Sequence, residues 1–114
     1  MADLTQARVI VTGAATGIGL AAAEHLHRLG SSVALLDINA KAVVGHAQRL
    51  DPIGQRAVGL EIDVADPASV ETACTDALKY LGGVDVLVNA AAGFTSSARV
   101  TEQTVQEWTS ALQI

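Results

Sequence analysis

Short apolar runs alternate along the chain with longer stretches in which apolar residues recur every three or four positions. The apolar runs at 8–12, 32–37, 56–62 and 84–89 are rich in β-branched residues and predict four strands. The periodic stretches at 17–29, 40–50 and 66–81 predict three helices, and a capping-box spacing from Thr104 to Glu107 predicts the start of a fourth. The first strand is apolar almost throughout, which is typical of a parallel sheet covered on both faces.

This alternating order predicts an α/β fold with helices on both faces of a parallel sheet. Because crossover connections are right-handed, we expect a Rossmann-type doubly wound sheet with strand order 3-2-1-4, which stops after its fourth strand–helix unit. Ligands bind such sheets outside the carboxyl ends of the strands, where the winding reverses. The loops after Thr12, Asp37 and Asn89 are expected to meet there. The length of 114 residues fits a single domain, 1–114.

Helical spacing predicts which side chains face the sheet. On the first helix these are Ile18, Ala22, Leu26 and Leu29; on the second, Val43, Ala47 and Leu50; on the third, Val70, Ala73, Ala77 and Leu81. Asp66 and Pro67 are typical of a helix start. The three histidines, His25, His27 and His46, have no partner at metal-ligand spacing and are expected at the surface.

A glycine-rich turn lies between the first strand and the first helix and reads Thr12-Gly13-Ala14-Ala15-Thr16-Gly17-Ile18-Gly19. Gly13 lets the chain turn sharply off the strand, and Gly17 lets the backbone approach a pyrophosphate. Gly19 lets the helix pack close to the sheet. The free N–H groups and partial positive charge of the helix N-terminus favour phosphate there. A tight turn that merely uses glycine is the alternative, but the strand–turn–helix context favours a phosphate site.

An acidic residue, Asp37, ends the second strand eighteen residues beyond Gly19. A carboxylate about 20 residues past the glycines accepts hydrogen bonds from an adenosine ribose and repels a 2′-phosphate. Thr16, Ile38 and Asn39 occupy positions where an Arg or Lys would attract that phosphate. The sequence therefore favours NAD over NADP. The alternative is that Asp37 only caps the turn that follows it.

Two further segments follow the third and fourth strands. Asp63 and Val64 are placed to bond the adenine amine and to pack on its ring, although Asp63 is equally typical of a turn. After Asn89, the small residues Ala90 and Ala91 leave room for a cofactor over the strand ends. The alternative is a loop shaped by packing alone.

Composition narrows the class of protein. Half of the residues are hydrophobic, which excludes a disordered chain, and the net charge of −5 disfavours nucleic-acid binding. No apolar run approaches the ~20 residues of a membrane span, and no signal peptide is recognisable. The only cysteine, Cys74, has no partner for an internal disulfide. We therefore expect a cytoplasmic protein that binds neither nucleic acid nor membrane.

Together the glycine turn, Asp37, Asp63-Val64, Val88-Asn89-Ala90-Ala91 and Trp108 closely resemble the short-chain dehydrogenase/reductase family, from Arg8 to Ile114. The resemblance implies an NAD-dependent oxidoreductase that moves hydride between an alcohol or carbonyl substrate and the nicotinamide. It also implies that the full-length form is a homo-oligomer. The residues that it assigns to the cofactor are Thr12, Gly13, Thr16, Gly17, Ile18, Gly19, Asp37, Ile38, Asp63, Val64, Asn89, Ala90 and Ala91. Where the family usually has Asn-x-Ala-Gly, this chain has one extra alanine before Gly93.

The proton-transfer residues of the family are not found in the sequence. The family uses a Tyr-x-x-x-Lys pair, but the only tyrosine, Tyr80, is followed four residues on by Val84. Ser96 and Ser97 lie too early to be the family's serine. We therefore expect the cofactor-binding part of a protein about twice as long, inactive alone, with an exposed edge at strand 84–89 that favours aggregation. A non-catalytic dinucleotide-binding module or partner subunit is the alternative. A methyltransferase fits poorly, because its glycine loop is usually G-x-G-x-G.

Overall fold

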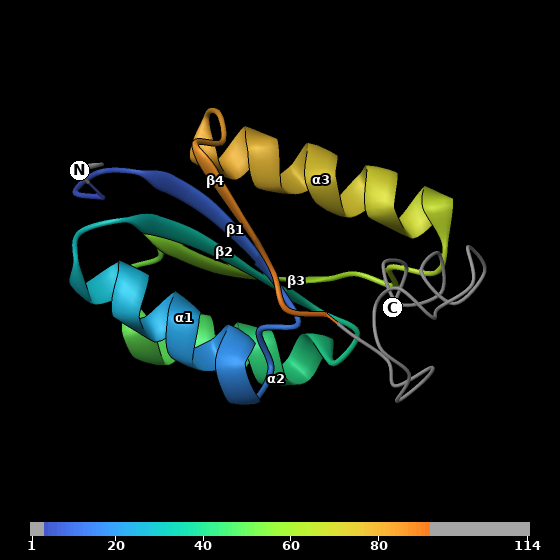
Figure 1. Cartoon of the computed structure of the whole chain (residues 1–114), viewed down its shortest axis with the longest axis horizontal. Helices are drawn as coiled ribbons and strands as arrows, with labels where there is room; N and C mark the ends of the chain where they lie inside the picture. The colour runs from blue at the N-terminus through green and yellow to red at the C-terminus, as the bar shows by residue number, and fades with distance from the viewer. Residues whose placement is uncertain (1–3, 92–114) are drawn as a thin grey trace, which may run out of the picture.

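The computed structural model describes residues 4–91, which form one parallel sheet with helices on both faces (Figure 1). The strands are β1 (Arg8–Thr12), β2 (Ser32–Asp37), β3 (Ala57–Glu61) and β4 (Val86–Asn89), and the helices are α1 (Gly17–Arg28), α2 (Ala40–Leu50) and α3 (Pro67–Leu81). The strand order is β3-β2-β1-β4, all parallel. This confirms the predicted doubly wound fold and its strand order. The helix predicted from Thr104 lies outside the described residues.

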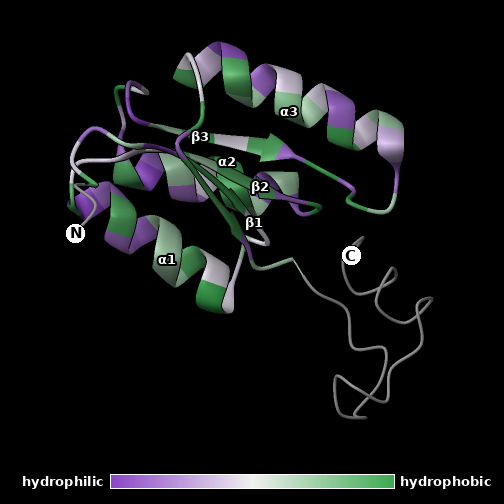
Figure 2. Cartoon of the chain, turned by 45° about the horizontal axis from the view of Figure 1, so that its top comes forward, coloured by the Kyte–Doolittle hydropathy of each residue, from purple (hydrophilic) through white to green (hydrophobic). Residues whose placement is uncertain are grey.

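Alternate side chains of the central strands supply two separate cores. Val9 and Val11 of β1 point to the side of α1 and α2, whereas Ile10 points to the side of α3. Leu35 and Leu36 of β2 divide in the same way, and both are fully buried. Figure 2 shows the resulting hydrophobic β1 and β2 between more mixed helices. The continuous apolar character of these strands therefore reflects burial on both faces.

Helix ends follow the predicted signals closely. Asp66 caps α3 by accepting a hydrogen bond from the N–H of Ala68 at 3.1 Å, and Pro67 is the first helical residue. At the end of α1, Gly30 has φ of +104°. The N–H of Ser31 reaches back to the carbonyl of Leu26 at 3.1 Å, which closes the helix in a Schellman arrangement. The third strand is one residue shorter at each end than the predicted 56–62.

The predicted inner face of α1 is confirmed at Leu26 but is wrong at Ile18 and at Leu29, which is 43% exposed. The buried residues are Gly19, Ala23, Leu26 and His27, and Ile18 is 84% exposed. The reason is that Gly19 is held against the glycine turn, and this contact sets the rotation of the helix. The expected surface position of His27 is therefore also wrong, because the same rotation turns its side chain inward.

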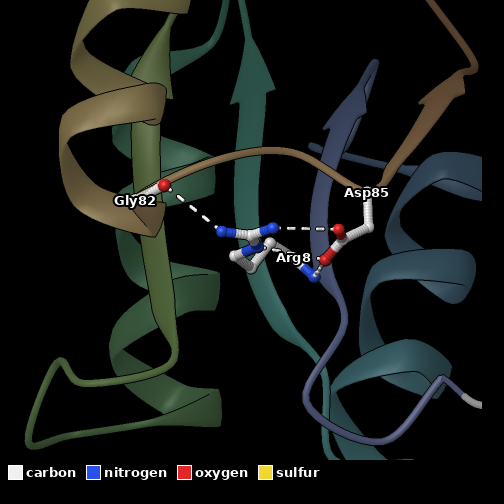
Figure 3. A network of polar contacts seen from close by, with 3 residues as sticks. All are labelled: Arg8, Gly82 and Asp85. Atoms are coloured by element: carbon white, nitrogen blue, oxygen red, sulfur yellow. Dashed lines mark hydrogen bonds and ion pairs between the residues drawn. The ribbon is translucent and has the colours of Figure 1, made fainter.

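An exposed ion pair joins the amino ends of β1 and β4 (Figure 3). The Asp85 carboxylate accepts hydrogen bonds from the Arg8 backbone N–H at 2.9 Å and from its Nε and Nη2 at 3.0 Å. The Nη1 group of Arg8 donates to the carbonyl of Gly82 at 3.2 Å. These bonds lower the pKa of Asp85 from 3.8 to about 2. They also explain why β4 begins at Val86 rather than at the predicted Val84, because Asp85 belongs to the turn that holds Arg8.

The outer side of β4 has no strand neighbour among residues 4–91. Leu87 in this strand is 63% exposed, and Val84 just before it is 37% exposed. This geometry agrees with the expected open edge, while the expected aggregation stays a prediction. Within the same residues, no helix is long and apolar enough to cross a bilayer.

Candidate functional site

A cavity of about 420 Å³ lies at the carboxyl ends of the strands, where the winding of the sheet reverses. Its size is within the range of small-molecule and cofactor sites. Four loops bring together its lining residues, which are Gly13, Thr16, Ile18, Gly19, Asp37, Ile38, Ile62, Asp63, Val64, Ala65, Ala90 and Ala91. Of the residues predicted from the sequence, Thr12, Gly17 and Asn89 are not in this lining. Ile62 and Ala65 were not predicted, although they flank Asp63-Val64 directly.

The glycine turn is tightly closed on two sides. Gly13 has φ of +69°, and a Cβ there would lie 2.6 Å from the backbone of Ala90. A Cβ on Gly19 would overlap the carbonyl group of Gly13. Gly17 differs, because it has φ of +59° but nothing within 4 Å of the position that a Cβ would take. The first and last glycines therefore shape the turn, while the middle one leaves open space at the start of α1.

The amino end of α1 is not capped in the way that the other helices are. The Asn39 side chain accepts from the N–H of Ala42 in α2, and Asp66 caps α3. By contrast, the side chain of the N-cap residue Thr16 makes no capping hydrogen bond. The first N–H groups of α1 and the positive end of the helix dipole therefore suit an anion.

The Asp37 carboxylate lies beside this helix end. Its Oδ2 accepts a hydrogen bond from the N–H of Ala15 at 3.1 Å, and its Oδ1 accepts from the N–H of Asn39 at 2.9 Å. The second bond is the turn cap that the sequence left as the alternative. Each oxygen keeps a further lone pair for a hydroxyl donor in the cavity. Capping the turn and binding a ligand are thus compatible for Asp37.

The other wall of the cavity combines apolar side chains with a second carboxylate. Ile38 is 65% exposed, and it lines the cavity with Ile62 and Val64. The Asp63 carboxylate accepts from the N–H of Ala65 at 3.0 Å, and the N–H of Asp63 donates to Ser69 Oγ at 2.8 Å. This loop is therefore held in place by its own turn and by α3. Its exposed apolar surface suits a flat ring.

A hydrogen bond between side chains supports the floor of the site. Thr12 Oγ1 donates to Asn89 Oδ1 at 2.7 Å, and the N–H of Ala90 donates to the carbonyl of Thr12 at 3.1 Å. Thr12 and Asn89 are partners in the β1–β4 register. They therefore fix the strand ends from which Gly13 and Ala90 enter the cavity.

Neither Tyr80 nor any of the histidines in the described part of the chain lines the cavity. The Tyr80 hydroxyl is within 2.7 Å of the Gly54 carbonyl and 3.2 Å of that of Ala57, at the amino end of β3, and burial raises its pKa. Among residues 4–91, no group of His, Cys, Asp and Glu is arranged to hold a metal ion. His46 is not simply a surface histidine as expected, because it is half-buried and bonded to the glycine turn.

A parallel sheet with a glycine turn, an open helix N-terminus and a carboxylate after the second strand defines a Rossmann-type nucleotide-binding domain. The sequence model of the short chain dehydrogenase family matches residues 7–114, and the chain belongs to this family of oxidoreductases.

Several characterised proteins are similar to this chain. It is 39% identical over 107 residues to D-threitol dehydrogenase of Mycolicibacterium smegmatis, covering 92% of this chain and 40% of that protein. It is 41% identical over 85 residues to sorbitol dehydrogenase of Cereibacter sphaeroides, covering 75% and 32% respectively. A short chain dehydrogenase from Burkholderia cenocepacia J2315, crystallised with NADP, superposes with a TM-score of 0.76 at 30% identity and covers 98% of this chain and 46% of its own. The chain thus spans less than half the length of each of these proteins.

Proposed function

We propose that this chain binds NAD for an oxidoreductase that transfers a hydride between a small alcohol or carbonyl substrate and the nicotinamide ring. The observation that carries the proposal is the charge of the cavity. Asp37 and Asp63 line it, and no Lys, Arg or His is among its lining residues in the described part of the chain. Because a ribose with free hydroxyls is a donor and a 2′-phosphate is an anion, this lining favours NAD.

The described residues fit such a cofactor at each of its parts. Gly17 leaves open space at the start of α1, where the N–H groups would hold the diphosphate. Asp37 would accept from the ribose, while Ile38, Asp63 and Val64 would hold the adenine. Beside Gly13, Ala90 and Ala91 leave room for the central part. When bound, the nicotinamide supplies a site that accepts or delivers a hydride.

The described residues of this chain would therefore bind and orient the cofactor. Tyr80, the only tyrosine, holds backbone carbonyls at the opposite end of the sheet from the cavity. Hydride transfer to or from an alcohol also needs a group that takes or gives the hydroxyl proton. We propose that this group, the substrate pocket and the interface of a homo-oligomer lie in a part of the whole protein that residues 4–91 do not include.

NADP is the second candidate, because the similar dehydrogenase from Burkholderia cenocepacia was crystallised with it. A 2′-phosphate would approach the Asp37 carboxylate, and none of the cavity-lining residues in the described part of the chain is cationic. Charge repulsion at this short range is the physical reason for ranking NADP second.

Titration of the chain with NADH and NADPH tests the proposal. We expect tighter binding of NADH. Because hydrogen bonds to a charged group contribute about 1.5–3 kcal/mol, Asp37→Ala is expected to weaken NADH binding by roughly 10- to 100-fold. The same change is expected to leave NADPH binding unchanged or stronger. Asp76→Ala, which removes an exposed carboxylate from α3, is the matched control and should change neither affinity. Equal losses for both cofactors with Asp37→Ala, or binding of S-adenosylmethionine alone, would contradict the proposal.

A further inference from the structure

His46 of α2 contacts the glycine turn although it belongs to none of the segments that predicted the site. Its Nε2 lies 2.9 Å from the carbonyl oxygen of Ala15, and its Nδ1 lies 3.3 Å from Nη2 of Arg49. A guanidinium group can only donate, so Nδ1 accepts. The proton of the neutral ring is then on Nε2, which donates to Ala15. The two contacts together define one tautomer of His46 and one direction for each hydrogen bond.

With the His46 contact, both backbone polar groups of Ala15 are hydrogen-bonded. The N–H of Ala15 donates to Asp37 Oδ2 at 3.1 Å, and its carbonyl accepts from His46. The peptide between Ala15 and Thr16 is trans, so its N–H points opposite to the carbonyl that His46 holds. Thr16 is the N-cap of α1 and lines the cavity. The orientation of this peptide therefore sets the direction of the Thr16 N–H, which belongs to a residue that lines the cavity.

His46 is itself held by a neighbour. Arg49, one helical turn further along α2, forms an ion pair with Glu24 of α1, with 3.4 Å between Nη1 and Oε2. A continuous series of polar contacts thus runs from α1 through Arg49 and His46 to Ala15 and ends at Asp37. It connects both helices on this face of the sheet to the helix N-terminus and to the carboxylate of the candidate site.

We propose that His46 is a positioning residue for the dinucleotide site. It fixes the Ala15–Thr16 peptide and, through the N–H of Ala15, the carboxylate of Asp37, without lining the cavity itself. This inference rests on the function proposed above. It predicts that removing the imidazole weakens cofactor binding and narrows the preference for NADH over NADPH, because both depend on the placement of Asp37.

Three variants of the full 114-residue chain test this role. His46→Ala removes both hydrogen bonds. His46→Gln keeps an amide donor near the position of Nε2, which preserves the bond to Ala15. His25→Ala removes an exposed histidine of α1 and serves as the matched control. Dissociation constants for NADH and NADPH, thermal unfolding and hydrogen exchange of the Ala15 amide are measured for each.

We expect His46→Ala to raise the dissociation constant of NADH by about 5-fold, as the loss of one net hydrogen bond of about 1 kcal/mol predicts. It should also bring the dissociation constants of NADH and NADPH closer together and speed hydrogen exchange of the Ala15 amide. His46→Gln should restore most of the affinity, and His25→Ala should match the wild type. Unchanged affinity and exchange in His46→Ala would overturn the inference, as would equal losses in the Ala and Gln variants that follow their melting temperatures. A wild-type chain that binds neither cofactor would instead overturn the proposed function, and the exchange rates would then decide only whether His46 fixes the Ala15 peptide.

Discussion

Gly17→Ala separates the cofactor-binding role of the glycine turn from its structural role. Gly17 has φ of +59°, so an alanine there adopts a left-handed conformation at a cost of about 1–2 kcal/mol. A less flexible unfolded chain offsets about 0.4–1 kcal/mol of this cost. No atom lies within 4 Å of the new Cβ, so no steric term is added. The free energy of unfolding should therefore fall by only about 1 kcal/mol, or about 4–8 °C in Tm.

The loss of cofactor binding should be larger than this loss of stability suggests. In the proposed function a diphosphate would approach the α1 amides past Gly17, and the new methyl group would obstruct it, so we expect NADH affinity to fall by at least about 10-fold. Gly54→Ala is a matched control, because Gly54 also has a positive φ, +79°, and nothing within 4 Å, but lies in the loop between α2 and β3. Isothermal titration calorimetry measures the NADH affinity of both variants, and thermal unfolding measures their stability. If the two variants bind NADH equally well, the open space at Gly17 is not a diphosphate site.

Two further predictions concern acid stability. The bond with Arg8 lowers the pKa of Asp85 from 3.8 to about 2, so its stabilising effect is present above pH 4 and is lost as the pH falls toward 2. Asp85→Asn should therefore lower the Tm at neutral pH and flatten its dependence on pH below 4. Burial and, to a smaller extent, the charge of Arg56 lower the pKa of His27 below 6.5 in the folded chain. As the pH drops below 6.5, His27 is therefore protonated more readily in the unfolded chain than in the folded one, and the stability of the fold decreases. The urea midpoint of His27→Leu should change less between pH 7.5 and pH 5 than that of the wild type. If the midpoints of the two proteins change equally with pH, the His27 ring is not held neutral by burial.

The sheet could be predicted from the sequence because its signals are local and agree with one another. Continuous apolar runs such as Arg8–Thr12 reflect burial on two faces, and Asp66-Pro67 fixes a helix start within one residue. The rotation of α1 could not be predicted in this way. Its apolar spacing allows Ile18 to face inward, whereas the role predicted for Gly19, close packing against the sheet, requires Gly19 to face inward, as it does in the structure. Apolar periodicity does not register a glycine, so the two signals disagree and the glycine motif is the correct one.

The residues of the candidate site also differ in whether local signals could predict them. The residues that line the cavity are mostly those next to strand ends, because the topology brings strand ends together. His46 is different, since its relation to the site depends on how α2 packs against the turn, thirty-one residues away in sequence. The burial of His27 and the bond of Tyr80 to the loop before β3 likewise depend on packing between distant elements.

On the side of the glycine turn, Ala90 and Ala91, the candidate site offers backbone groups and small residues, and this has a consequence for how its affinity is set. Backbone N–H groups cannot be re-aimed by a rotamer change, so their direction depends on the elements that carry them. Thr12 with Asn89 fixes the strand ends at the floor, and Arg8 with Asp85 fixes the same strand pair at its other end. His46 holds the glycine turn that leads from β1 into α1. Substitutions that change cofactor affinity in this chain should therefore include residues that do not contact the cofactor. Such substitutions should change the dissociation constant measurably even where they leave the melting temperature almost unchanged.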